Sequence, residues 1–177
     1  MPDSLYLKFK AKTDWNFFLI LSIGWIICFI LFKCRINYFG KENEALDGRF
    51  FGYSPQEVVD LFARLFIIEK LNFYAITELS LDLIFPIIYV GMSAFLIVRL
   101  YAEKRAKYLI LIPVFLGLAD FAENFTIAYL AFTFNNRVSS IAYLASALTS
   151  LKWFLVGICL LIIIFGVISL LFKRKSQ

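Results

Sequence analysis

The sequence predicts an all-α, polytopic membrane protein: a four-transmembrane-helix bundle with an amphipathic helix in the first extramembrane loop. Three observations carry this prediction. Hydrophobic residues make up 62% of the 177 residues, and the mean hydropathy is +0.81, far above that of a soluble domain. Four apolar runs are each long enough to cross the hydrocarbon core of a bilayer. Basic residues flank these runs, as they do in membrane proteins. We expect a single domain over residues 1–177.

The first apolar run, residues 15–32, is expected to be an uncleaved first helix. A cleaved signal peptide has a shorter apolar region and a small-residue cleavage site, but this run ends in Lys33, Cys34 and Arg35. We interpret Lys33 and Arg35 as the charged flank of the span.

An amphipathic helix over about residues 55–70 is expected in the first loop. Ser54 and Glu57 form a capping-box pattern around Pro55, which suits the first helical position. One apolar stripe follows at i, i+3, i+4 and i+7: Val58, Leu61, Phe62 and Leu65. We expect this helix on the membrane surface or over the mouth of the bundle, where it either fills a groove between the other helices or acts as a lid.

The other spans are expected at about residues 73–98, 108–134 and 141–172. Basic residues concentrate in the N-terminal tail, in the loop after the second span and in the C-terminal tail. By the positive-inside rule, both termini are predicted to be cytoplasmic, in either a bacterial inner membrane or the endoplasmic reticulum.

Three of these spans carry ionisable side chains at a similar depth. Glu78 and Asp82 are four residues apart and share one helix face. Counted at about 1.5 Å per residue, Asp82, Asp120 and Lys152 all fall in the outer half of the core. Charged groups there are costly, face the bundle interior and mark function. The predicted ligand-binding residues are Glu78, Asp82, Tyr89, Asp120, Glu123, Asn124 and Lys152.

The charges of this set do not balance. Lys152 is the one cation expected among four acids, Glu78, Asp82, Asp120 and Glu123. Either some acids are protonated, or a cationic guest completes the balance. Pro86 lacks an N–H, so it frees the backbone carbonyl of Asp82 and is expected to kink the helix there.

Structural explanations stay open for the same residues. A buried ion pair between Lys152 and an acid can fix helix register without serving a ligand. Glu78 is expected at the water boundary, as a solvated acid, and Lys152 can instead snorkel to the outer headgroups. Tyr89 can be an interfacial anchor.

Composition excludes several kinds of chemistry. The chain contains no histidine, which rules out His-ligated metals, haem and imidazole-based catalysis. Its three cysteines form no CxxC pair, so we predict no metal site and no cofactor. The net charge of +5 follows from the helix flanks and requires no nucleic-acid partner.

The layout resembles the family of the emopamil-binding sterol isomerase and the sigma-two-type receptor. The resemblance lies in four helices, a long first outer loop, acids and a proline in the second helix and further acids in the third. It implies an intramembrane pocket whose acids meet an amine or a carbocation-like centre. The pattern is also similar to small bacterial four-helix membrane proteins of unassigned function; it comprises Asp82-x3-Pro86-x2-Tyr89, Asp120-x2-Glu123-Asn124 and Lys152-Trp153.

These observations lead to three functional hypotheses. The first is an outer-leaflet pocket for a lipid-like or cationic small molecule. The second is an intramembrane isomerase or lipid hydrolase, with Asp120 and Glu123 as candidate catalytic acid and base. The third is a structural subunit that pairs with other membrane subunits. Membrane lipids or a hydrophobic small molecule are the expected partners, alongside a second copy of the chain or other subunits.

Overall fold

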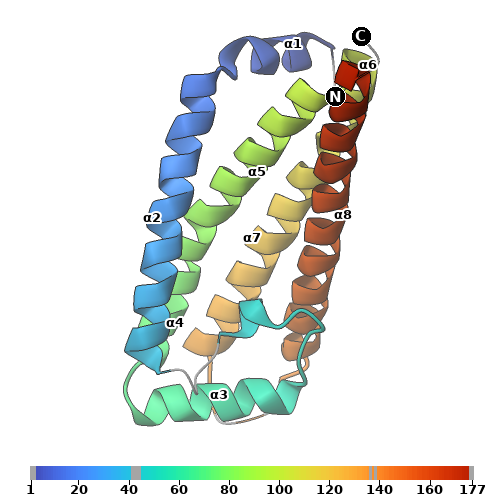
Figure 1. The fold of residues 1–177 in the computed structure, drawn as a ribbon. Coiled ribbons are helices and arrows are strands. Elements are labelled where there is room, and N and C mark those ends of the chain that lie inside the picture. Colours follow the sequence, from blue (N-terminus) through green and yellow to red (C-terminus); the bar gives the residue numbers. More distant parts are fainter. Residues whose placement is uncertain (1–2, 41–44, 136, 138, 176–177) are drawn as a thin grey trace.

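The computed structural model describes residues 3–40, 45–135, 137 and 139–175, with the backbone alone for 3–5 and 173–175. Within these ranges the chain is helical and contains no strand. The outermost residues of the predicted domain, 1–2 and 176–177, lie outside the described residues. Helix α1 (Asp3–Lys12) and the C-terminal end of α8 lie at the same end of the bundle (Figure 1).

Within the described part of the chain, four helical segments are long and apolar enough to cross a membrane, as predicted. They are α2 (Trp15–Phe39), α4 with α5 (Leu71–Glu78 and Leu81–Leu100), α6 with α7 (Glu103–Leu109 and Leu111–Phe132), and α8 (Ile141–Lys175). Helix α5 packs against α7, while α2 packs against α5 and α8 against α7. The protein is therefore a multi-pass integral membrane protein built as a four-helix bundle.

The first span is longer than predicted, because Arg35 does not end it. Helix α2 continues to Phe39 and ends at Gly40, whose φ of 91° favours glycine and whose N–H bonds to the carbonyl of Ile36 at 3.0 Å. Arg35 is only 7% exposed. The interpretation of Arg35 as the charged flank of the span was wrong, since its side chain bonds to carboxylates inside the bundle.

Helix α3 (Pro55–Ile67) closes one end of the bundle, where it lies across the other helices (Figure 1). Both bonds of the predicted capping box are present between Ser54 and Glu57, and the accepted backbone bond lowers the pKa of the Glu57 carboxyl. The predicted stripe is buried. It packs on residues of α4, α7 and α8, including Tyr74, Ile127 and Ala145. The amphipathic helix thus covers the mouth of the bundle.

The second span is interrupted at Leu79 and Ser80, and α5 continues through Pro86. The interruption lies six to seven residues before Pro86, which is almost two helical turns. The hydroxyls of Thr77 and Ser80 donate to the carbonyls of Tyr74 and Ile76, both at 2.7 Å. Such bonds offer the backbone an alternative to the helical ladder, so the interruption lies at these residues.

The carbonyl freed by Pro86 has a specific partner. Asn124 on α7 donates its side-chain amide to the backbone oxygen of Asp82 at 2.7 Å, in the buried interior. A buried carbonyl left without a donor costs about 1–3 kcal/mol. The Pro86 and Asn124 pair therefore joins α5 to α7 beside the buried acids.

We predict that Asn124→Ala lowers the free energy of unfolding by about 1 kcal/mol, because it leaves the Asp82 carbonyl unsatisfied. Adding Pro86→Ala should recover most of the loss, since residue 86 then supplies its own N–H to that carbonyl. Thermal unfolding in mild detergent measures both effects. Thr126→Val, which also removes a side-chain hydrogen bond to a backbone carbonyl, at a half-buried position of the same helix, is the control. A double variant as unstable as Asn124→Ala alone would contradict this explanation.

Candidate functional site

Arg35 on α2 is the centre of a first charge cluster. Its Nη1 donates directly to Asp82 Oδ2 on α5, and its Nη2 lies 3.5 Å from both carboxylate oxygens of Asp47. Glu78, the last residue of α4, has Oε1 at 3.9 Å from the same Nη1. Among the described residues, one guanidinium thus meets three carboxylates from three different elements.

Lys152 on α8 is the centre of a second cluster. Its Nζ lies 2.7 Å from Glu123 Oε2 and 3.5 Å from Asp120 Oδ1, both on α7. The Thr149 hydroxyl donates to the other oxygen of Glu123 at 2.7 Å, and the Tyr89 hydroxyl donates to Asp120 Oδ2 at 2.6 Å. Lys152 is 7% exposed, so it forms a buried ion pair and does not snorkel to the headgroups.

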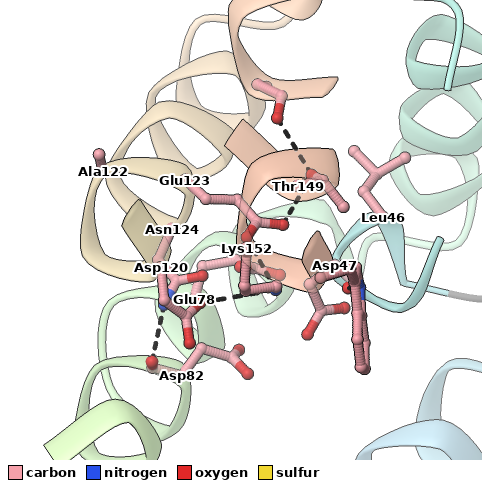
Figure 2. A network of polar contacts seen from close by, with 12 residues as sticks. Leu46, Asp47, Glu78, Asp82, Asp120, Ala122, Glu123, Asn124, Thr149 and Lys152 are labelled. Atoms are coloured by element: carbon pink, nitrogen blue, oxygen red, sulfur yellow. Dashed lines mark hydrogen bonds and ion pairs between the residues drawn. The ribbon is translucent and has the colours of Figure 1, made fainter. Parts of the chain in front are cut away.

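The two clusters lie next to each other in the interior. Asp47 and Asp82 interact electrostatically with both Arg35 and Lys152. Figure 2 shows Asp120 and Glu123 at Lys152, with Glu78, Asp82 and Asp47 in the same region of the interior. Across the described residues, five acids therefore stand against two cations, Arg35 and Lys152. If every group is ionised, an excess of three negative charges is buried in the bundle.

Asp47 belongs to the short 3₁₀ helix η1 (Leu46–Gly48), which covers this cluster from the first loop. Loss of hydration alone would raise the pKa of the Asp47 carboxyl, but Arg35 and Lys152 hold that pKa below its usual range. The Trp153 indole donates to the Asp47 carbonyl at 2.9 Å, and the Phe50 ring lies 4.0 Å from that of Trp153. These contacts fix the loop over the cluster with an ionised carboxylate on its inner side.

A cavity of about 460 Å³ lies between α3 and the start of α8, but the charged residues instead border a larger one of about 610 Å³. Its volume is in the range of sites for small organic ligands. The polar part of its wall consists of Arg35, Asp47, Asp82, Tyr89, Ser93, Asp120 and Lys152. Apolar side chains form most of the remaining wall, including Trp25, Phe85, Leu116, Val156, Leu160 and Ile163.

The charged side chains lie at one end of this cavity, and the other end is apolar except for the Ser93 hydroxyl. Along α2 the wall runs from Arg35 back to Trp25, and along α8 from Lys152 on to Ile163. At about 1.5 Å per residue, each of these distances is about 15 Å. Trp25 and Leu160 are 39% and 54% exposed, so the apolar part is open toward the surroundings at the edges formed by α2 and α8.

The structure brings all seven predicted site residues together, but it gives them different surroundings. Asp82, Tyr89, Asp120 and Lys152 belong to the cavity wall. Within the described ranges, Glu78, Glu123 and Asn124 are not part of it. Glu78 is 0% exposed, so the expectation of a solvated acid was wrong: its neighbours include Arg35 of α2, Asp47 of the first loop and Asp82 of α5.

Sequence reasoning missed Arg35 and Asp47. Arg35 continues a buried face of α2 that includes Cys28 and Phe39, at i, i+7 and i+11. This helical spacing was the available signal. Asp47 carried no signal of this kind, because its position depends on how a loop folds over the bundle.

Comparisons with protein-family models, with curated proteins and with solved structures find no match for this chain. The resemblance to the sterol isomerase family therefore stays a prediction. Functional inference rests on the geometry of the site.

We predict that Arg35→Gln lowers the free energy of unfolding by about 3–5 kcal/mol, because it leaves buried carboxylates without their cation. Lys33→Gln, two residues earlier on the exposed face of α2, is the matched control and should change stability by less than about 0.5 kcal/mol. Thermal unfolding in mild detergent measures the difference.

Adding Asp82→Asn to Arg35→Gln should restore part of the lost stability, since it removes one of the uncompensated acids. Equal stability of the Arg35→Gln and Lys33→Gln proteins would show that the guanidinium does not compensate the acids.

Proposed function

We propose that this protein binds a lipid-like, cationic small molecule in the cavity between α2 and α8. The ligand is a single-chain amphiphile, with its positive head among the carboxylates and its chain along the apolar wall. The observation that carries the proposal is the excess of acids over cations at one end of a largely apolar cavity. Apolar pockets with a few convergent polar groups are the usual form of small-molecule sites.

Electrostatics favour the binding of a cationic head group over a neutral or anionic one. Three carboxylates on the wall, those of Asp47, Asp82 and Asp120, face the two cations. At an effective dielectric constant of about 20, opposite charges about 4 Å apart attract by about 4 kcal/mol. An anionic head would instead add to an existing negative excess. The site therefore discriminates by charge.

Asp120 is the carboxylate best placed to receive the head. It lies on the cavity wall, and the Tyr89 hydroxyl holds one of its oxygens. Lys152 lies closer to Glu123 than to Asp120, at 2.7 Å against 3.5 Å. Lys152 therefore neutralises the charge of the Asp120 carboxylate less than that of the Glu123 carboxylate.

The shape of the cavity supports a chain-bearing ligand. Its length of about 15 Å equals half the thickness of a bilayer core, which is the depth of one leaflet. The exposed edges at Trp25 and Leu160 offer entry from the membrane. If both termini are cytoplasmic, the polar end, which lies away from α1, is in the outer leaflet (Figure 1).

The ion pairs favour a ligand site over a subunit interface. Arg35 and Lys152 meet acids of their own chain, so the cluster needs no partner helix for its main contacts. This arrangement weakens the hypothesis of a structural subunit.

An intramembrane acid–base enzyme is the second candidate function. The hydrogen bond from Tyr89 to Asp120 on the cavity wall favours it, because such a pair can exchange a proton with a bound substrate. Of the two catalytic candidates, Asp120 alone borders the cavity within the described residues, while Glu123 would act through Lys152. Incubation with sterols and glycerolipids, followed by mass spectrometry of the products, tests this candidate; unchanged lipids would exclude it for those substrates.

We predict that the protein in zwitterionic nanodiscs binds radiolabelled dodecyltrimethylammonium above the background of protein-free discs. Dodecanol should compete poorly and dodecyl sulfate not at all, because neither has a cationic head. Asp120→Asn should weaken binding by about tenfold or more, since it removes a charged partner of the head. Its fold should persist, because Asn can still accept from Tyr89.

Asp60→Asn on the exposed face of α3 is the matched control and should bind as the wild type does. Equal competition by the three chain-matched compounds, or full binding by Asp120→Asn, would rule out recognition by charge.

A further inference from the structure

Glu78 is a buried acid that the proposed ligand site does not use. Its side chain is 0% exposed, and neither carboxyl oxygen has a hydrogen-bond partner among the described residues. The nearest cation is Arg35, at 3.9 Å, and that guanidinium already bonds to Asp82 and Asp47. An ionised carboxylate without hydrogen bonds is strongly disfavoured at such a place.

The groups that face Glu78 further raise the free energy of its ionised state. They come from the elements packed around it: Arg35 of α2, Asp47 of η1, Tyr53 before α3, Tyr74 of α4, Asp82 of α5 and Glu123 of α7. One of them is a cation and three are acids. The Tyr74 hydroxyl already accepts from the Leu46 N–H at 3.2 Å, and burial raises the pKa of the Tyr53 phenol well above its usual value. Both phenols are therefore neutral and cannot compensate a further negative charge.

We propose that Glu78 is a proton-binding site linked to the occupancy of the cavity. With the cavity empty, Glu78 carries a proton, which reduces the buried negative excess. When a cationic head binds beside Asp120 and Asp82, the added positive charge replaces that proton, and Glu78 becomes a carboxylate. One cation enters and one proton leaves to water, so the net charge of the cluster is unchanged.

One further feature supports this exchange. The Asp47 side chain, bonded to the same guanidinium, is 21% exposed, so the cluster is accessible to solvent on the side of η1. The inference rests on the proposed function, because it requires a cationic ligand in the cavity.

The test uses dodecyltrimethylammonium, whose charge does not change with pH, and the full chain in zwitterionic nanodiscs. Affinity is measured from about pH 5 to about pH 8, and proton release with an indicator dye in weakly buffered solution. For one proton released per ligand, affinity should rise up to about tenfold per pH unit. The sign follows because a higher pH favours the deprotonated, cation-bound state.

Glu78→Gln imitates the protonated acid. It should fold as the wild type does and bind the ligand, but with an affinity almost independent of pH and without proton release. Glu69→Gln, an exposed acid beyond the end of α3, is the matched control and should keep the wild-type pH dependence.

Each outcome discriminates. Binding without proton release, or an unchanged pH dependence in Glu78→Gln, would overturn the proton site and leave the proposed function standing. A Glu78→Gln protein that unfolds would show that Glu78 is needed as a carboxylate, and would also overturn the proton site. Absence of binding at every pH would overturn both proposals.

Discussion

The structure depends on the compensation of charge in a medium that does not solvate it. Arg35 and Lys152 enter the interior from α2 and α8, and the acids that they meet lie between them, mainly on α4, α5 and α7. Removing one partner of a buried pair is far more costly than the pair itself is favourable. These ion pairs therefore fix the positions of α2 and α8 at the polar end. At the other end, the Tyr101 hydroxyl donates to the Ile162 carbonyl of α8 at 2.6 Å, and Arg99 donates to the Thr13 carbonyl just before α2 at 2.8 Å.

The cavity and its chemistry follow from this arrangement. Arg35 of α2 and Lys152 of α8 both border the charged end of the cavity, together with Asp47, Asp82 and Asp120. Two cations cannot neutralise five acids, so the interior requires further positive charge. We propose that a ligand head group and a proton supply it at neighbouring places, since Asp120 borders the cavity while Glu78 is fully buried beside Arg35.

Sequence reasoning reached the parts of the structure that local rules determine. Hydropathy located four spans, the Ser54 and Glu57 pattern located α3, and Pro86 indicated a free carbonyl that Asn124 was found to occupy. It failed where a contact joins distant segments. Arg35 resembled the charged end of a span because its partner Asp82 lies 47 residues further on. Glu78 resembled an exposed acid because nothing in the sequence around it predicts that the first loop, with Asp47, folds next to it.

The most direct test of the account is a crystal structure with an ammonium amphiphile that carries bromine at the end of its chain, located by anomalous scattering. We predict bromine at the apolar end of the cavity, near Trp25 and Ile163, with the head-group nitrogen within ion-pair distance of Asp120. Bromine beside Arg35 and Asp47, or absent from the cavity, would contradict the claim that the buried carboxylates select and orient a cationic ligand.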